Sequence, residues 1–352
     1  MNSFNRRHFL LTAAAGAAIP AITEQAWAQP LPSNEQALYE AAKREGELVW
    51  LAGHVSAEPA EAAGKAFTAR YPGIKVTVQR ASSQVLFQRI SQDLRAGAPQ
   101  SDVFSSTDHT HYQLLKRQGQ LERFRPKNVD SLIKTPGFTD PDDFFQITSV
   151  LLFLIGYNTQ KVQADQIPKS WLDAVDPKWK NQLAIGHPGY SGGIAALTVA
   201  LQKMYGWDYF KKLEQNKPHL GRSADDPITL LNAGERNIGL GLATNTLLLS
   251  ISRGNPLKLI YPTDGVLTAY SPSAIPKNAP HPNAAKLFME FLTGTAYAQA
   301  VRPFFVHSLR PEVPPPEGAL ALSAMKLISP TPKEVEAGIP EIKEKWRDTF
   351  GI

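Results

Sequence analysis

Short apolar runs alternate with helical stretches near the start of this chain, and this alternation constrains its fold more than any other feature. Residues 47–51 (ELVWL) and 74–78 have the pattern of strands, and residues 60–70 between them have that of a helix. A second helical stretch at 82–94 leads to a third strand at 101–104. Strands that alternate with helices predict a mostly parallel sheet with helices on both faces. We therefore predict an α/β fold, with any ligand at the carboxyl ends of the strands.

The same order begins again after a proline-rich, charged loop at residues 124–143. The apolar run at 147–157 is too long for one ordinary strand, so we expect it to cross between two lobes as a hinge strand. Further strands are predicted at 183–185, 237–242 and 257–261, and helices at 195–205 and 283–300. We assign residues 30–143 and 266–310 to lobe one, residues 144–265 to lobe two, and residues 311–352 to C-terminal helices that pack back on lobe two.

The first residues have the pattern of an export signal, here assigned to residues 1–28. Two arginines, Arg6 and Arg7, precede an Ala/Leu-rich apolar run that ends in a small-x-small sequence at Ala28. The arginine pair resembles a twin-arginine signal, and an ordinary secretory signal is the alternative. The run is short and broken by Pro20, so it does not suit a membrane span. We expect cleavage near Ala28 and a soluble protein in the periplasm.

Charge and cysteine content narrow the function classes. The formal net charge is +5, and it falls by one if the signal with Arg6, Arg7 and Glu24 is removed. Acidic and basic residues are interspersed, which favours small anions weakly and argues against nucleic acid as a partner. The chain has no cysteine, so disulfides and a lipid anchor on an N-terminal cysteine are excluded. We expect a monomer without a cofactor.

The sequence Gly189-Tyr190-Ser191-Gly192-Gly193 fits the G-x-S-x-G spacing of a serine hydrolase. A nucleophilic Ser191 needs an acid and a histidine later in the chain, and Asp264 with His281 or His307 has that order. The same residues also follow a strand and begin a helix, where backbone N–H groups and a hydroxyl bind an anion. A plain glycine-rich helix start is the third interpretation. We favour the anion site and expect no catalysis.

Several other polar residues have both a functional and a structural interpretation. His54 follows a strand, where it contacts a ligand or is an ordinary loop histidine. Ser82 and Ser83 are ligand contacts or N-caps of the helix that follows them. Asp264 lies in a Pro-Thr-Asp-Gly turn and either binds a ligand amine or serves the turn. Tyr270 is either a wall of the cleft or a core aromatic residue.

A pair of histidines, His109 and His111, lies near the start of a predicted helix. No third metal ligand stands at a recognisable spacing from them. We expect these two side chains to be solvated, and we predict no metal site.

Segments in a fixed order through nearly the whole chain resemble a known family. They are residues 47–56 (ELVWLAGHVS), 66–78 (AFTARYPGIKVTV), 102–104, 177–181, 191–192, 232–235 and 284–292. Together they are similar to the type II periplasmic solute-binding proteins of ABC importers, and within them to the ferric-ion-binding branch. The resemblance implies two lobes that close about a hinge on a ligand, a membrane permease as partner, and no enzymatic activity.

The ligands of the ferric branch are only partly present in this chain. Members of that branch hold Fe(III) with one His, one Glu and two consecutive Tyr residues, together with a synergistic anion. His54 falls at the histidine position, Thr107 at the carboxylate position with Asp108 next to it, and Thr246-Leu247 at the tyrosine pair. A leucine cannot bind iron. The resemblance therefore implies a small organic anion, either a carboxylate or a phosphorylated or phosphonate compound, with an atypical ferric site as the alternative.

The predicted site draws on both lobes. Thr244 and Asn245 follow a strand and add neutral donors, and the planar guanidinium of Arg222 matches a carboxylate or a phosphate. The full set of predicted ligand-binding residues is His54, Ser56, Ser82, Ser83, Thr107, Asp108, Ser191, Gly192, Gly193, Arg222, Thr244, Asn245, Asp264 and Tyr270.

Overall fold

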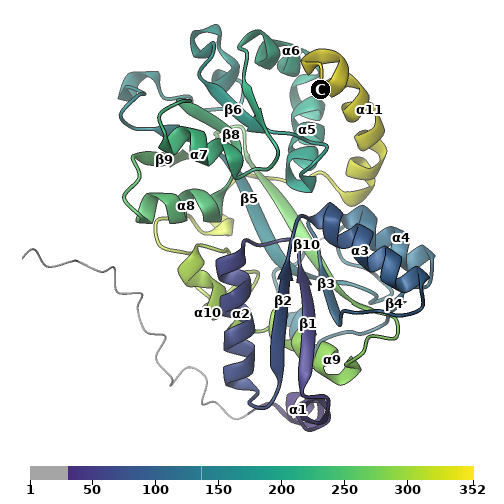
Figure 1. The fold of residues 1–352 in the computed structure, drawn as a ribbon. Helices are drawn as coiled ribbons and strands as arrows, with labels where there is room; N and C mark the ends of the chain where they lie inside the picture. The colour runs from purple at the N-terminus through teal and green to yellow at the C-terminus, as the bar shows by residue number, and fades with distance from the viewer. Residues whose placement is uncertain (1–30, 136) are drawn as a thin grey trace, which may run out of the picture.

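Two lobes joined by two long strands make up the structure (Figure 1). The computed structural model describes residues 31–135 and 137–352, so the predicted export signal lies outside the described residues. The joining strands are β5 (Gln146–Asn158) and β10 (Val266–Pro276), which pair with each other in antiparallel fashion. The crossing strand expected at 147–157 is therefore part of β5, and the α/β two-lobed fold is confirmed.

Lobe one contains the first three strands and the helices that connect them. The order β2-β1-β3 forms one half of the sheet, with β1 parallel to both of its neighbours. These strands are β1 (Glu47–Ala52), β2 (Lys75–Arg80) and β3 (Val103–Ser105). The helices of this lobe are α1 (Ser33–Glu45), α2 (Ala57–Arg70), α3 (Ser83–Arg95), α4 (His109–Arg117), α9 (Pro282–Leu292) and α10 (Thr295–Val301).

Apolar packing fixes both faces of this half of the sheet. On one face Phe288 of α9 lies between Trp50 of β1 and Phe67 of α2, with ring centroids 5.1 and 5.0 Å apart. On the other face α3 and α4 cover Leu51 and Phe104. Helices cover both faces of β1 and β3. The side chains of these two strands are therefore mostly apolar and nearly all buried.

The prediction of one helix at 283–300 is wrong. α9 ends at Leu292 and α10 begins at Thr295. The hydroxyl of Thr293 donates to the carbonyl oxygen of Met289 at 2.8 Å, and Gly294 then takes an extended conformation with φ −92° and ψ 166°. Hydrophobic periodicity continues across the break, which is why the pattern alone did not reveal it.

Lobe two contains the other half of the sheet. The strand β8 (Ile238–Ala243) pairs with β5, and β6 (Leu183–Gly186) and β7 (His219–Gly221) follow it in parallel. A further strand, β9 (Leu257–Ile260), pairs with the end of β5. The helices are α5 (Gly192–Tyr205), α6 (Asp208–Gln215), α7 (Asp226–Asn232) and α8 (Thr244–Ser252).

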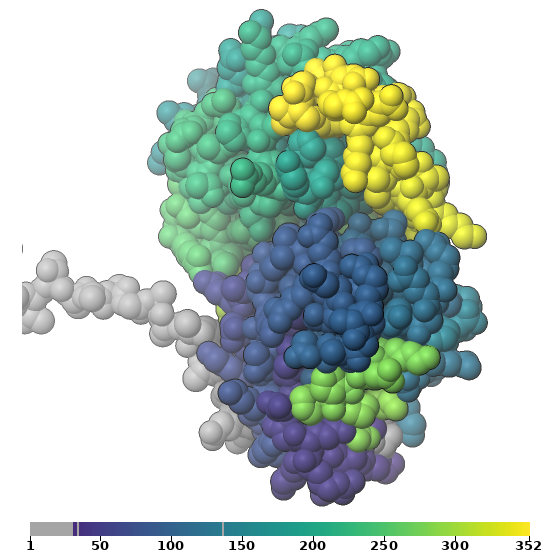
Figure 2. Space-filling model, turned by 45° about the vertical axis from the view of Figure 1, so that its right-hand side comes forward, coloured from purple at the N-terminus to yellow at the C-terminus, as the bar shows by residue number. Residues whose placement is uncertain are grey.

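The C-terminal segment ends in one helix, α11 (Pro332–Phe350), where several were expected. It begins with a capping box between Thr331 and Glu334 and packs along α5 and α6. Its Trp346 is completely buried in the core of lobe two. Figure 2 shows the segment in yellow lying over lobe two and extending down toward lobe one. Two short strands, β4 (Leu121–Glu122) and β11 (Leu327–Ile328), pair with β10.

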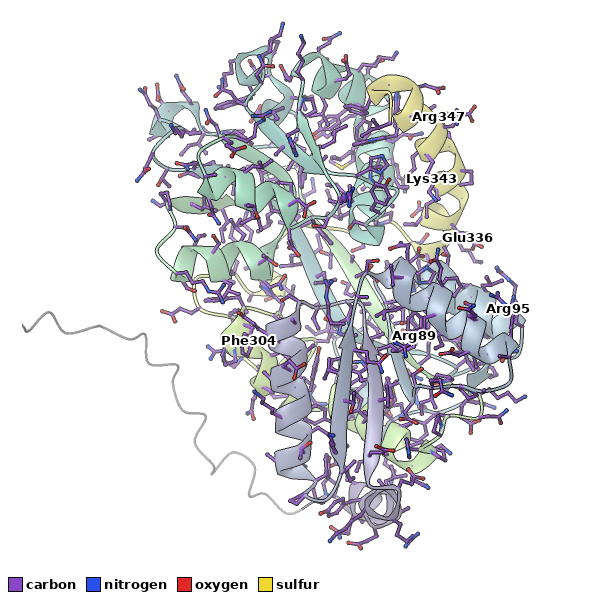
Figure 3. All side chains as sticks on the ribbon, viewed as in Figure 1. Arg89, Arg95, Phe304, Glu336, Lys343 and Arg347 are labelled. Atoms are coloured by element: carbon purple, nitrogen blue, oxygen red, sulfur yellow. The ribbon has the colours of Figure 1, made fainter. Side chains whose placement is uncertain are left out.

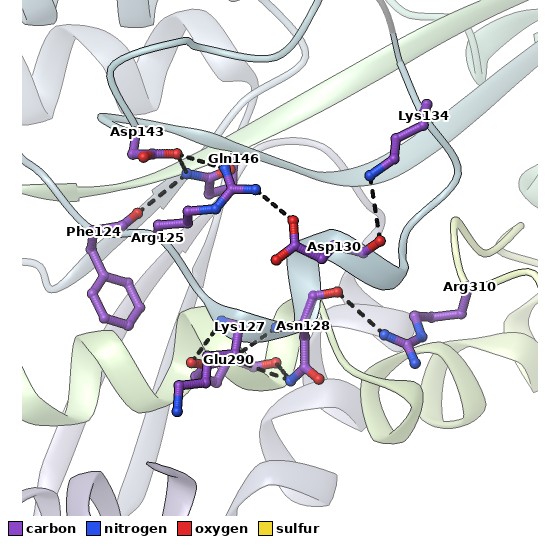
Figure 4. Close-up of polar contacts among 10 residues, drawn as sticks. All are labelled: Phe124, Arg125, Lys127, Asn128, Asp130, Lys134, Asp143, Gln146, Glu290 and Arg310. Atoms are coloured by element: carbon purple, nitrogen blue, oxygen red, sulfur yellow. Dashed lines mark hydrogen bonds and ion pairs between the residues drawn. The ribbon is translucent and has the colours of Figure 1, made fainter.

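The loop predicted at 124–143 is held by polar contacts (Figure 4). The Glu290 carboxylate of α9 accepts from the backbone N–H groups of Lys127 and Asn128 at 3.0 and 3.3 Å. Arg125 pairs with Asp130 at 2.6 Å and with Asp143 at 3.0 Å.

Short 3₁₀ helices occur at Lys127–Ser131, Ala164–Gln166, Asp173–Val175, Pro177–Trp179, Arg302–Phe304 and Leu322–Ala324. Within residues 31–135 and 137–352, no helix has the length and apolar character needed to cross a membrane.

Candidate ligand-binding cleft

A cleft of about 660 Å³ lies between the lobes and is lined by residues from both. Lobe one contributes the residues that follow β1, β2 and β3, and lobe two contributes the starts of α5, α7 and α8. Of the predicted set, the structure brings together His54, Ser56, Ser82, Ser83, Thr107, Ser191, Gly192, Gly193, Arg222 and Asn245. The volume suits a small organic molecule.

Ser83 joins the ends of the three strands of lobe one. Its hydroxyl donates to the carbonyl oxygen of Gly53 at 3.1 Å and accepts from the backbone N–H of Thr107 at 3.1 Å. The Thr107 hydroxyl lies 3.1 Å from the same oxygen. Ser83 is buried, and its hydrogen bonds are made within the protein. It therefore shapes this wall of the cleft and leaves the Thr107 hydroxyl facing lobe two.

The other two serines of this wall stand at helix starts. Ser82 is the N-cap of α3, and its hydroxyl accepts from the backbone N–H of Val85 at 3.4 Å. Ser56 is the N-cap of α2 and has no side-chain cap bond. The structural interpretation of Ser82 therefore holds, and both side chains also line the cleft.

His54 is a buried, neutral member of the site. It is only 3 % exposed, and its Nε2 lies 3.4 Å from the Tyr297 hydroxyl. Burial, with a smaller contribution from the charge of Arg80, lowers the pKa of His54 from 6.5 to about 3. The imidazole is therefore uncharged at neutral pH and acts as one donor and one acceptor. Within the described ranges, its Nδ1 has no hydrogen-bond partner.

Arg80 is a cleft residue that the sequence analysis missed. It is the last residue of β2, and its Nε donates to the carbonyl oxygen of Val55 at 3.1 Å. This bond fixes the guanidinium at the edge where the other strand ends also meet. The sequence contains one sign that Arg80 lies near the cleft, because Arg80 immediately precedes the loop that holds Ser82. The alternation along β2, however, marks Arg80 as a solvated residue.

The start of α5 forms the facing wall. Ser191 is the N-cap, and its hydroxyl accepts from the backbone N–H of Ile194 at 3.4 Å. A Cβ added at Gly193 would lie 2.1 Å from the Phe153 ring, and one at Gly192 would lie 3.0 Å from the Thr107 hydroxyl. Glycine is required at Gly193 because β5 approaches the helix start too closely for any side chain. The contact of Gly192 with Thr107 also shows that the two lobes touch here.

Positive charge and free N–H groups converge on this part of the cleft. The first N–H groups of an α-helix have no carbonyl partner within the helix, and its dipole favours an anion there. Arg222 lines the same cleft with an exposed side chain, and its backbone N–H donates to the Asp226 carboxylate at 2.6 Å. With Arg80 opposite, the cleft has one arginine on each lobe. In proteins generally, helix starts and arginine side chains contact carboxylate and phosphate groups by charge and by geometry.

Four predicted residues lie outside the cleft and have structural partners. Asp108 is the N-cap of α4 and accepts from the Thr110 backbone N–H at 2.9 Å. The Thr244 hydroxyl donates to the carbonyl oxygen of Leu152 at 2.9 Å. Asp264 accepts from the backbone N–H of Trp171 at 2.8 Å and from the hydroxyl of Tyr205. Tyr270 contacts Phe138 at a separate cavity of about 30 Å³. Position after a strand does not ensure that a side chain faces the ligand.

The expectation that His109 and His111 are solvated is wrong. They are 8 % and 6 % exposed. His109 Nε2 lies 2.7 Å from the carbonyl oxygen of Tyr270, and His111 stacks on Phe87 with ring centroids 3.9 Å apart. Burial lowers the pKa of both side chains. Across the two described ranges, no group of three His, Cys, Asp or Glu side chains is placed to hold a metal ion.

The residues expected for a hydrolase are not assembled around Ser191. His281 contacts the Asp102 carboxylate at 3.0 Å, and His307 lies 3.2 Å from the carbonyl oxygen of Leu320. Neither lines the cleft. The histidine that does so, His54, lies on the opposite lobe beside Tyr297. Ser191 thus has the surroundings of a helix cap.

Residues after β8 complete the lobe-two wall. Asn245 and Thr246 line the cleft at the start of α8, whereas Leu247 is fully buried in the core. The cleft also contains Asp225 and the 60 % exposed Tyr190, which the sequence analysis did not select. Asp225 precedes Asp226-Pro227, a pattern typical of a helix start, and this local pattern does not indicate a position in the cleft.

Two lobes around a polar cleft, joined by paired crossing strands, define a binding protein of the hinged two-lobed class. Residues 53–299 match the family of bacterial extracellular solute-binding proteins. The chain therefore belongs to this family, whose members serve ABC transporters.

Named relatives bind different solutes. The chain is 27% identical to the major ferric iron-binding protein of Neisseria meningitidis over 252 residues, which cover 67% of this chain and 72% of that protein. It is 25% identical to the spermidine/putrescine-binding periplasmic protein of Salmonella typhimurium over 260 residues, 67% of this chain and 70% of that protein. The periplasmic binding protein AfuA from Actinobacillus pleuropneumoniae, solved with exogenous fructose-6-phosphate bound, has a TM-score of 0.75 at 24% identity. That match covers 87% of this chain and 99% of AfuA.

Proposed function

We propose that this protein is the substrate-binding component of an ABC importer and that it binds a small organic anion in the cleft between its lobes. The anion carries a carboxylate, phosphate or phosphonate group. The protein acts as a monomer in the periplasm after loss of residues 1–28, without a cofactor and without catalysis. The lobes close on the solute and present it to a membrane permease.

One observation carries this proposal: the start of α5 and one arginine from each lobe line the same cleft. Gly192 and Gly193 supply backbone N–H groups, Ser191 supplies its hydroxyl, and Arg80 and Arg222 supply positive charge. An anion is stabilised by about 0.3–1 kcal/mol at an exposed helix start and by more where it is partly buried. A paired guanidinium adds a charge-assisted hydrogen bond. A cationic solute such as a polyamine would instead be repelled by both arginines.

Thermal unfolding of the purified protein tests the proposal. Lactate, glycerol 3-phosphate and ethylphosphonate represent the three anion classes, and putrescine represents the cations. A solute present at 100 times its Kd should raise the free energy of unfolding by about 2.7 kcal/mol. The double variant R80Q/R222Q should lose this effect, whereas Arg89→Gln should keep it. Arg89 lies on α3, outside the cleft (Figure 3). Stabilisation by putrescine alone would contradict the proposal.

An atypical ferric site remains the second candidate, favoured by the ferric iron-binding relative. Tyr190 is the only tyrosine that lines the cleft within the described residues. If it bound Fe(III) together with an anion, iron and citrate added to the protein would produce a visible charge-transfer band that Tyr190→Phe abolishes. We expect no such band. Hydrolysis of an activated ester that depends on Ser191 would favour the third candidate, a serine hydrolase.

A further inference from the structure

Asp225 is a negatively charged residue in an otherwise positive cleft. It lines the cleft from lobe two, directly before α7. Its Oδ1 is buried, and no group in the described part of the chain forms a hydrogen bond with it. The Thr246 side chain bonds to the same carboxylate, and burial raises the pKa of Asp225.

The neighbouring Asp226 shows that Asp225 is not needed to hold the loop. The Asp226 carboxylate accepts from the backbone N–H of Arg222 at 2.6 Å and from the Ser223 hydroxyl at 2.7 Å. It therefore organises the turn before α7, and Asp225 makes no side-chain cap bond to that helix. The two adjacent carboxylates thus have different partners. Asp226 holds the turn, and Asp225 contacts Thr246 of α8 and keeps one buried oxygen without a partner in the described structure.

Arg80 faces Asp225 from lobe one and attracts it electrostatically. In the described structure their attraction acts at longer range, and the two side chains form no direct ion pair. A buried carboxylate oxygen without a partner destabilises the folded protein, because its hydration is lost and no hydrogen bond replaces it. An acceptor of this kind at a binding surface suits a donor that arrives with the ligand.

Resting on the proposed function, we propose that Asp225 determines the specificity of the cleft by accepting a hydrogen bond from a hydroxyl or ammonium group of the bound solute. The anionic group of the same solute lies at the start of α5. The cleft then selects an anion that has a donor at some distance from its charge. Dicarboxylates bind poorly, because their second carboxylate would face Asp225, and anions without a donor arm lose the added bond.

His54 adds a second polar atom to the same cleft. Its Nδ1 is also buried without a partner in the described structure, and the ring is neutral. A neutral imidazole and a carboxylate together suit a polar arm with hydroxyl or amine groups better than an apolar chain.

Isothermal titration of the wild-type protein with three matched phosphates tests the inference. Ethyl phosphate has no donor arm, phosphoethanolamine has an ammonium group, and glycerol 3-phosphate has hydroxyl groups. At least one of the two donor-bearing compounds should bind about tenfold or more tightly than ethyl phosphate, as expected for a hydrogen bond to a charged group. The tighter of the two identifies the kind of donor.

Two substitutions in the same lobe complete the test. Asp225→Asn should reduce the preference for the donor-bearing compound to less than about threefold, and it should leave ethyl phosphate bound equally or more tightly. Asp165→Asn, an exposed residue away from the cleft, should change none of the three affinities. Circular dichroism verifies folding, and Asp225→Ser replaces Asp225→Asn if the latter does not fold.

The possible failures are distinguishable. If ethyl phosphate binds as tightly as both donor-bearing compounds, or if Asp225→Asn leaves their preference intact, the inference about Asp225 is wrong and the proposed anion site stands. If none of the three phosphates binds, the inference about Asp225 is wrong. If, in addition, no carboxylate or phosphonate stabilises the protein, the proposed anion site is wrong as well.

Discussion

At the scale of single residues, the protonation of His54 couples the cleft to pH. The pKa of this buried histidine is lowered from 6.5 to about 3. Below pH 6.5 the unfolded chain binds a proton on His54 while the folded chain does not, so acid favours unfolding. Stability from this residue is complete above pH 6.5 and falls as the pH approaches 3. The loss amounts to about 2 kcal/mol near pH 5.

Chemical denaturation of the wild type and of His54→Gln at about pH 7.5 and about pH 5 measures this effect. The free energy of unfolding should fall by about 2 kcal/mol less in the variant. His109, His111 and His307 also have lowered pKa values, but they are common to both proteins and cancel in the difference. Equal pH dependence in the two proteins would show that folding does not lower the pKa of His54.

Gly193 tests how closely β5 approaches the start of α5. Gly193→Ala places a methyl group against the Phe153 ring, where an unrelaxed Cβ would lie 2.1 Å from it. We expect a loss of about 1–3 kcal/mol in stability and weaker binding of any solute that uses the helix start. Adding Phe153→Leu should recover part of both losses, because the smaller side chain makes room. A double variant no better than Gly193→Ala would contradict this explanation.

The residues of the cleft were predictable only in part. Strand ends at the carboxyl edge of the sheet correctly indicated His54, Ser83 and the start of α5 as cleft residues. The same rule also selected Thr244, which does not line the cleft, because its hydroxyl donates to the backbone carbonyl oxygen of Leu152 in β5. Asp225 escaped the analysis because its sequence context is that of a helix cap. Only the contacts show that Asp226 holds the turn before α7 and that the Asp225 side chain does not cap the helix.

At the scale of secondary structure, Trp346 is the largest of the buried side chains that attach α11 to lobe two, and Ile342 is another. Trp346 is fully buried beside Phe210 and His187, with ring centroids 5.8 and 5.7 Å away. Trp346→Ala should lower the free energy of unfolding by about 3–5 kcal/mol in a urea titration. The neighbouring Arg347 is exposed (Figure 3), so Arg347→Ala should change it by less than about 0.5 kcal/mol. Similar values for both would show that α11 does not contribute to this core.

Sequence patterns placed most strands and helices because each has one apolar face or is wholly buried. They failed at Gly294, where a break leaves the apolar spacing unchanged, and in the C-terminal segment. Pro340 lies inside α11, and a proline within a helical pattern normally predicts an end or a kink. Packing against α5 and α6 compensates for it, and local sequence does not contain that information.

At the scale of the whole molecule, charged pairs hold the lobes together at the surface. Arg253 of lobe two contacts both oxygens of Glu58 on lobe one, at 2.7 and 2.9 Å. Glu336 of α11 lies 3.7 Å from Arg117 of α4, at the end of α11 nearest lobe one (Figure 3). Because a closed cleft brings these residues together, the pairs favour the closed form.

A double-mutant cycle with Glu58→Gln and Arg253→Gln measures the first pair. Each variant should weaken binding of the cleft solute about two- to fivefold, with a coupling energy of about 0.2–1 kcal/mol, since both side chains are exposed. The effect should shrink in about 0.5 M salt, where screening shortens the range of the charges. A coupling near zero at low salt would mean that this contact does not affect closure.

The pairing of β5 with β10 has a mechanical consequence. Each strand belongs to both lobes, and the two are hydrogen bonded to each other from Leu267–Phe153 to Ser273–Gln146. Rotation of the lobes must therefore twist a continuous ribbon, whose register already shifts at Ser271/Pro272, where the proline lacks an N–H donor. The elastic resistance of this ribbon opposes closure of the lobes on a solute. The solute therefore binds less tightly than it would if the two lobes were joined by a flexible linker.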